Sequence, residues 1–307
     1  MKKIIFAFFI LIILFSFTGC KLDLSKKTFS NKNEEIKKEL VELIKKEYEY
    51  TVKVEITGKT IGVYFPVDNL LEDSKAEEKK INKDVAEKID RIIFLVHRVV
   101  LSSDNNLEFY TVVTVDMKSG EQLLITGYFY DVIRARLENI SRGEFSQRLL
   151  KGLDKNDKMI GDWDGKNFKI DEIFLPNFLV NQIVQRIRVA TFKEKDIPEE
   201  NNFFSLFFKD KKPEEKFEAK DVKWGLENKI FTFVLEIPDY QVENAREIFG
   251  CILNSTVDTL YSYDFDYNAV RIFVGNKDET KKIFFINKKD LELFRKKKIK
   301  IENLINE

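Results

Sequence analysis

The sequence predicts an α+β fold made of two related modules, each with the element order β-β-α-β-β-α. Short runs of β-branched and aromatic residues occur in pairs separated by turn residues, which is typical of hairpins. Each pair is followed by a long segment whose apolar residues recur every three or four positions, which indicates an amphipathic helix. The same order occurs twice, over residues 50–137 and 219–297. We therefore expect two antiparallel sheets, each packed on its long helix, joined by a helical linker.

The first module is predicted to open with a hairpin. Apolar and β-branched residues alternate over 50–57 and 60–66, and Gly58-Lys59 between them suits a tight turn. A long helix follows, with apolar residues at Ile81, Val85, Ile89, Ile92, Val96 and Val99. The remaining elements of this module are two strands over 107–117 and 121–126 and a helix over 129–137.

The second module repeats this order with little sequence identity. Its predicted strands cover 219–225, 229–237, 266–274 and 281–286. A last helix covers 289–297, and the long helix carries regularly spaced residues at Val242, Ala245, Phe249, Ile252, Thr256 and Leu260. Residues 100–104 and 260–264, which precede equivalent strands, are also similar. We interpret the pattern as a duplication. Two arrangements stay open, namely separate sheets or one larger sheet joined at an edge.

Composition shifts divide the chain further. The predicted division is a signal peptide over 1–19, a polar tether over 20–35, the first module over 36–150, a linker over 151–215 and the second module over 216–307. The linker has a helical pattern over 175–191. Its charged end contains the aromatic run 203–208, which we expect to pack on the core of one of the modules. The alternative is an exposed partner site.

The start of the chain has the order of a secretory leader. Lys2-Lys3 form a positive start, an almost unbroken apolar run covers 4–17, and Thr18-Gly19 precede Cys20. At 1.5 Å per residue this run is too short for a bilayer core of about 30 Å. The pattern therefore favours a cleaved leader. The alternatives are an ordinary leader with a chance cysteine and an uncleaved anchor.

The stretch Phe17-Thr18-Gly19-Cys20 resembles the lipobox of bacterial lipoproteins, in which an aliphatic residue, a small residue and Gly or Ala precede the cysteine. Phe17 stands where Leu is usual. The resemblance implies that Cys20 Sγ takes a diacylglycerol, that cleavage follows Gly19, and that the new amino group is acylated by a fatty acid such as palmitate. In the enteric sorting rule, an Asp after the cysteine retains the protein at the inner membrane. Lys21 therefore implies the periplasmic face of the outer membrane in a cell with two membranes.

The composition argues against a nucleic-acid partner and for a packed core. The chain has 52 Lys and Arg residues and 52 Asp and Glu residues, a balance without the basic excess that nucleic acid requires. An aromatic content of 13% predicts packing rather than disorder. If Cys20 is lipidated, Cys251 has no intramolecular disulfide partner. We interpret Cys251 as a buried structural thiol, with a reactive thiol as the alternative.

The sequence contains no recognisable catalytic or cofactor-binding motif. His97 is the only histidine and lies in an apolar helical segment, which predicts a core histidine rather than a general base. The turn around Asp162 and Asp164 resembles a calcium loop only faintly, because Ile160 falls where the first ligand is needed. We therefore expect no metal and no cofactor.

A group of arginines follows the last strand of the first module: Arg134, Arg136, Arg142, Arg148, Arg186 and Arg188. One interpretation is a basic face that contacts anionic lipid headgroups or polyanionic envelope glycans. The alternative is an ordinary solvated helix surface.

Together these features predict an envelope lipoprotein, held to the membrane through Cys20, that is not an enzyme. We expect a scaffold or binding module for an unidentified envelope protein. Two other classes stay open. The 28 Phe residues permit a carrier of a small apolar ligand or lipid, and the abundant carboxylates permit a carbohydrate- or peptidoglycan-active hydrolase.

Overall fold

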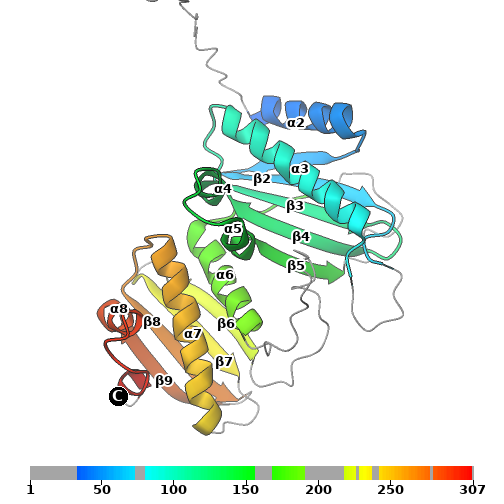
Figure 1. Cartoon of the computed structure of the whole chain (residues 1–307). Helices are drawn as coiled ribbons and strands as arrows, with labels where there is room; N and C mark the ends of the chain where they lie inside the picture. Colours follow the sequence, from blue (N-terminus) through cyan, green and yellow to red (C-terminus); the bar gives the residue numbers. More distant parts are fainter. Residues whose placement is uncertain are drawn as a thin grey trace, which may run out of the picture.

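The computed structural model describes residues 33–72, 80–155, 168–190, 218–225, 228–236, 242–276 and 279–305. These residues form two β-sheets and the helices that connect their strands, which confirms the α+β class (Figure 1). The first sheet has the strand order β1-β2-β3-β4-β5, and the second has the order β6-β7-β8-β9. No ladder joins the described strands of one sheet to those of the other, so the two sheets are separate.

The observed elements follow the predicted order. The first half contains α2 (Asn33–Tyr48), β1 (Lys53–Thr57), β2 (Thr60–Val67), α3 (Lys83–Ser102), β3 (Phe109–Asp116), β4 (Glu121–Tyr128), α4 (Phe129–Arg136), α5 (Arg142–Arg148) and β5 (Leu150–Lys155). The second half contains α6 (Leu175–Ala190), β6 (Glu218–Gly225), β7 (Ile230–Glu236), α7 (Val242–Ser262), β8 (Ala269–Asn276), β9 (Glu279–Asn287), α8 (Lys288–Arg295) and α9 (Glu302–Ile305). Each strand and helix of the two predicted β-β-α-β-β-α patterns is present, with its ends shifted by a few residues at most.

Both sheets are mixed, so the prediction of antiparallel sheets is wrong for the central strand pair. β2 pairs with β3 in parallel, with Tyr64 opposite Val113, and β7 pairs with β8 in parallel, with Val234 opposite Phe273. The flanking pairs are antiparallel. The physical reason is the long helix between the central strands. α3 and α7 each return the chain to the end where the preceding strand began, so the next strand runs in the same direction.

Three elements of the first half, α2, α5 and β5, lie outside the predicted pattern. α2 covers residues expected in the tether and at the start of the module, and its Ile36, Leu40 and Ile44 are fully buried in the first core. The spacing of four between these residues is a helical signal, which the many Lys and Glu residues around them obscure. β5 extends the first sheet beside β4, with Leu150 opposite Thr126.

The segment 151–215, expected as a linker, contributes to both halves. It contains most of β5, which belongs to the first sheet. It also contains α6, which adds five buried side chains to the second core: Phe178, Leu179, Val180, Ile183 and Ile187. The first core instead joins α2 and α3 to its own sheet, for example through Ile89, Ile61 and Val112. The described parts of this segment therefore pack into both halves of the structure.

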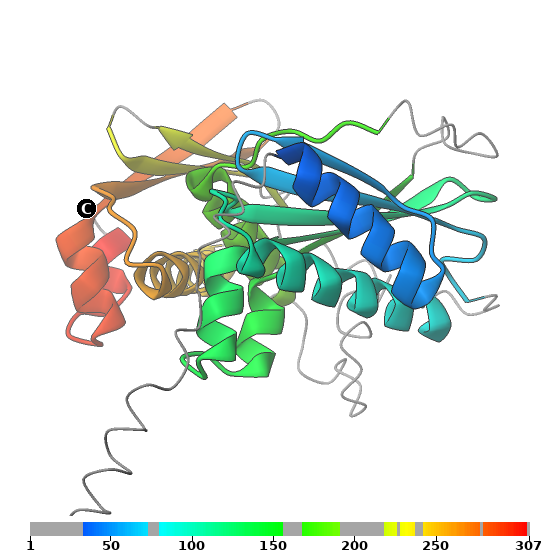
Figure 2. The same ribbon diagram turned by 90° about the horizontal axis from the view of Figure 1, so that it is seen from above.

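An extended segment over residues 168–174, which we call the strap, covers one face of the first sheet. Figure 2 shows the strap on the opposite side of this sheet from α3. The Phe168 ring centroid lies 5.2 Å from that of Tyr64 in β2. At the other end of the strap, Ile173 N donates to Thr60 Oγ1 at 2.8 Å. The strap therefore covers β2 on the face of the first sheet that points away from α3.

Gly62 lies under the strap, and its replacement by alanine should destabilise the protein. A Cβ there would lie 2.5 Å from Ile170 Cγ2 and 3.2 Å from Phe168 Cζ, closer than packed carbon atoms approach. We expect Gly62→Ala to lower the free energy of unfolding by about 1–3 kcal/mol, as overpacking does, measured by denaturant unfolding. Gly152 in β5 is the matched control, because no atom lies within 4 Å of the Cβ that alanine would add. Equal losses at the two positions would contradict this account.

Candidate functional site

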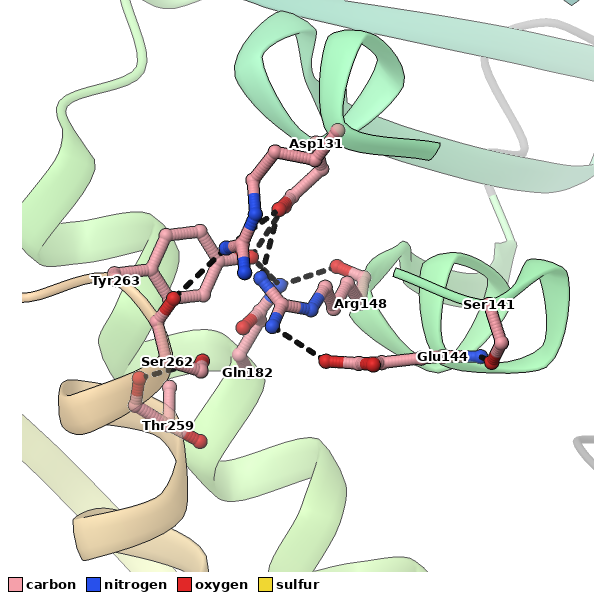
Figure 3. Close-up of polar contacts among 9 residues, drawn as sticks. Asp131, Ser141, Glu144, Arg148, Gln182, Thr259, Ser262 and Tyr263 are labelled. Atoms are coloured by element: carbon pink, nitrogen blue, oxygen red, sulfur yellow. Dashed lines mark hydrogen bonds and ion pairs between the residues drawn. The ribbon is translucent and has the colours of Figure 1, made fainter. Parts of the chain in front are cut away.

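A cluster of buried and partly buried polar side chains lies where the two halves meet, and we call it the junction network (Figure 3). Its members are Asp131 from α4, Glu144 and Arg148 from α5, Gln182 from α6 and Tyr263 just after α7. The side chains of Arg148 and Asp131 are 1% and 2% exposed. Charged groups buried to this degree need internal partners, because an uncompensated interior charge is strongly disfavoured.

Arg148 is the centre of the network. Its Nη1 donates to Asp131 Oδ1 at 2.8 Å, and its Nη2 donates to Glu144 Oε1 at 2.6 Å. The guanidinium carbon also lies 4.8 Å from the centre of the Tyr263 ring, which is within cation–π range. One guanidinium therefore contacts α4, α5 and the residue that follows α7.

Tyr263 and Gln182 connect the network to the second half. The Tyr263 hydroxyl donates to Asp131 Oδ2. Gln182 Nε2 donates to the Tyr263 hydroxyl oxygen at 2.9 Å and also to the Arg148 carbonyl oxygen. Asp131 thus accepts one hydrogen bond from a guanidinium of the first half and one from a hydroxyl of the second half. The network therefore spans the junction.

Two short helices after the first sheet position these groups. α4 starts directly after β4, so Asp131 lies in its first turn. α5 begins at an N-cap, where Ser141 Oγ accepts from Glu144 N at 3.0 Å. Glu144 and Arg148 are four residues apart in α5, which places their side chains on one face of the helix. The acid in the first turn and the base in the last turn also suit the helix dipole.

A second arginine ties α4 to the end of α7. Arg134 Nη1 donates to the Ser262 carbonyl oxygen at 2.8 Å. Carbonyl groups in the last turn of a helix lack helical partners and favour a nearby cation. The same nitrogen lies 4.0 Å from Asp131 Oδ1. α4 therefore reaches the second half through both Asp131 and Arg134.

Burial and neighbouring charges shift the pKa values of the network. Burial raises the pKa of Asp131, although the Tyr263 hydroxyl, Arg148 and Arg134 oppose the rise. Burial lowers the pKa of Arg148, but Asp131, Tyr263 and Glu144 outweigh that effect and leave it above its ordinary value. Burial and then Asp131 raise the pKa of Tyr263. Tyr263 therefore remains protonated and keeps donating its hydrogen bond throughout the physiological pH range.

This arrangement is suited to holding two parts of the fold together. Each oxygen of Asp131 already accepts a hydrogen bond, which makes its carboxylate a poor proton acceptor for a substrate. Among the described residues, no three His, Cys, Asp or Glu side chains are grouped so that they could bind a metal ion. The hydrogen bonds of the network connect the two halves of the structure.

The structure separates the arginines that the sequence groups together. Arg148 is enclosed by the junction network and is not available to a lipid headgroup or another external polyanion. Arg134 is mostly buried, and Arg186 is partly buried, with a pKa lowered by burial and by the charge of Arg148. Among the members of this group whose side chains the structure describes, only Arg136 and Arg142 are exposed.

His97 is buried, as its apolar segment predicts. Its ring centroid lies 4.6 Å from that of Tyr110, and the rings of Phe129 and Phe145 also surround it. Burial, together with the charge of Arg136, lowers the pKa of His97 to about 3. Its Nε2 has no hydrogen-bond partner within the described part of the chain. The imidazole is therefore neutral at neutral pH.

Several predicted features lie outside the described residues: Cys20, the acidic turn at Asp162 and Asp164, the aromatic run 203–208 and the side chain of Arg188. Cys251, expected to be buried, is partly buried at the second core, with its Sγ 3.9 Å from the Ile187 carbonyl oxygen. Of the helices that the structure describes, none combines the length and the apolar character needed to cross a bilayer.

Sequence patterns identify only part of the junction network. Arg134 and Arg148 stand out as members of an arginine group, but nothing marks Gln182 or Tyr263. The one signal for Asp131 is its position beside the buried Phe129 and Val132 of α4. Comparison with known proteins adds no assignment, since no family model, no curated protein and no solved structure matches this chain.

Proposed function

We propose that this protein is a membrane-anchored lipoprotein of the cell envelope that acts as a non-enzymatic scaffold or binding module. The lipobox-like stretch that ends at Cys20 supports the anchor, and Lys21 favours the periplasmic face of the outer membrane. α2 begins at Asn33, so about a dozen residues separate the folded body from Cys20. An extended chain of that length reaches at most about 40 Å. The body therefore stays near the membrane surface.

The observation that carries the binding role is an open apolar face on the second sheet. Phe284 packs against Phe249 of α7, with ring centroids 4.5 Å apart, so its neighbours Ile283 and Phe285 point to the opposite face. These two side chains are 60% and 57% exposed. The Arg271 guanidinium carbon lies 5.7 Å from the centre of the Phe285 ring. Exposed aromatic and aliphatic side chains beside an arginine are typical of protein interaction surfaces.

The same proposal includes a duplication of one β-β-α-β-β-α module. The shared element order supports it, and so does the register of the central strands. In the first parallel pair, Tyr64 lies opposite Val113, four residues after the first paired residues of β2 and β3. In the second, Val234 lies opposite Phe273, also four residues after the first paired residues of β7 and β8. In the first sheet the strap covers Tyr64, whereas Val234 is exposed in the second sheet. The second copy thus presents to a partner the face that the first copy buries.

Photo-crosslinking in cells tests the binding face. A photoreactive amino acid at Phe285 should give one discrete protein adduct, because an envelope partner is expected to cover this position. The same amino acid at Phe94, an equally exposed residue of α3, is the matched control and should give none. The further change Ile283→Ser should weaken the Phe285 adduct. Equal adduct yields at Phe285 and Phe94 would remove the support for a partner on the second sheet.

Acyl labelling tests the anchor. In cells supplied with labelled palmitate, Cys20→Ser should abolish incorporation of the label and leave the leader uncleaved, because the thiol that accepts the diacylglycerol is gone. Cys251→Ser is the matched control and should keep both labelling and cleavage. Labelling that survives Cys20→Ser would refute the assignment of Cys20 as the lipid site.

A further inference from the structure

α4 carries a stripe of exposed apolar side chains along its outer side. Tyr130 and Leu137 are 52% and 65% exposed, and Ile133 between them is also exposed. Leu137 is the residue that caps the C-terminus of α4, and spacings of three and four residues place the three side chains on one side, which we call the α4 stripe. Phe129 and Val132 of the same helix are buried in the first core. α4 therefore has an apolar face with no covering element among the described residues.

The charges around the α4 stripe are mainly basic. Arg136 follows in α4 and Arg142 opens α5, and both are exposed. Arg134 lies beside the stripe, with its guanidinium carbon 5.8 Å from the centre of the Tyr130 ring. Of the acids nearby, Glu138 is exposed, Glu144 and Glu108 are partly exposed and paired with Arg148 and Lys59, and Asp131 is enclosed in the junction network. An apolar stripe flanked by arginines and ending in a tyrosine has the composition of an interfacial helix, in which arginines meet anionic headgroups.

We infer that the α4 stripe docks the folded body on the anionic surface of the membrane that holds Cys20. This inference rests on the proposed lipid anchor. Peripheral contacts of this size bind weakly alone, because only a few basic residues lie near the anionic surface. The anchor makes docking an intramolecular event, so a weak contact suffices. In Figure 1, α4 lies at the same end of the first sheet as the start of α2, the first described helix after the tether.

Docking through α4 also sets the orientation of the second half. Asp131 and Arg134 of the same helix bond to Tyr263 and to the Ser262 carbonyl group. A membrane contact on the outer side of α4 is therefore coupled through one short helix to the end of α7. The open face around Phe285 is then held at a defined angle to the bilayer.

Fluorescence of a single probe on the anchored protein tests the inference. The full chain, acylated at Cys20 in cells and carrying Cys251→Ser and Ile133→Cys, is labelled with an environment-sensitive dye and reconstituted in vesicles. With phosphatidylglycerol present, we expect a blue shift and quenching by a quencher attached to the acyl chains. Phosphatidylcholine alone, or the added changes Arg136→Gln and Arg142→Gln, should abolish both signals. The same dye at Phe285→Cys is the matched control and should show neither.

The outcomes separate the docking surface from the anchor. Acylation of Cys20 is read independently from the mass of the purified protein. If the chain is acylated and the dye at residue 133 behaves like the dye at residue 285, the docking surface is refuted and the lipoprotein proposal stands. If the chain is not acylated, the lipoprotein proposal falls and this inference falls with it.

Discussion

Arg148→Met should lower the free energy of unfolding by roughly 3–5 kcal/mol, the cost of removing one partner from a buried ion pair. The substitution leaves the Asp131 carboxylate buried without the guanidinium that lies 2.8 Å from it. It also removes the hydrogen bond to Glu144 and the cation–π contact with Tyr263. Denaturant unfolding followed by circular dichroism measures the change.

Arg142→Met is the matched control, because Arg142 lies in the same helix and is exposed. Its effect should stay within about 0.5 kcal/mol. Adding Asp131→Asn to Arg148→Met should recover part of the loss, since no uncompensated carboxylate then remains in the interior. Equal losses at the two arginines, or no recovery in the double variant, would contradict the role given to the buried pair.

His97 should make the protein lose stability as the pH falls below neutrality. Its pKa is 6.5 when unperturbed, as in the unfolded chain, whereas burial lowers the pKa of the folded group to about 3. Between these two values the unfolded state binds a proton that the folded state does not. The stability from the neutral imidazole is therefore complete above pH 6.5 and is lost as the pH falls toward 3. The free energy of unfolding should fall by about 1.4 kcal/mol per pH unit from this group alone.

His97→Phe isolates this contribution. Phenylalanine keeps an aromatic ring against Tyr110 and removes the buried Nε2, which has no hydrogen-bond partner in the described part of the chain. Between pH 6.5 and pH 5 the variant should lose this fall of about 1.4 kcal/mol per pH unit, because the other titrating groups are the same in both proteins. His97 is the only histidine, so no other imidazole titrates there. Identical slopes for the two proteins would show that the folded imidazole protonates normally.

The elements of the fold were largely predictable because their signals are local. The apolar residues of α3 recur at helical spacing from Val85 to Val100, and the hairpin turn at Gly58 has the positive φ of 54° that glycine allows. The parallel central pairs were also implied by a helix between two strands, but that inference requires following the chain across the sheet. α2 was missed because its three buried residues stand among Lys and Glu.

The junction network could not be predicted because its contacts join distant parts of the chain. Asp131 and Tyr263 are 132 residues apart, and Gln182 and Tyr263 are 81 apart. Arg148 belongs to a group that resembles a solvated basic surface, and only the packing of α5 against α6 and the end of α7 encloses it. Burial of a charge depends on what covers it, which no local pattern records.

α6 is synthesised before the sheet whose core it helps to fill. The five strands of the first sheet all precede α6 in the chain and therefore reach the compartment where the protein folds before it does. Phe178 of α6 can then pack on Phe109 of β3, whose ring centroid lies 5.3 Å away. The rest of the second core is completed only when β8, which starts at Ala269, and β9 arrive. In that interval part of the apolar face of α6 stays uncovered, and a chaperone that shields such segments is expected to act there.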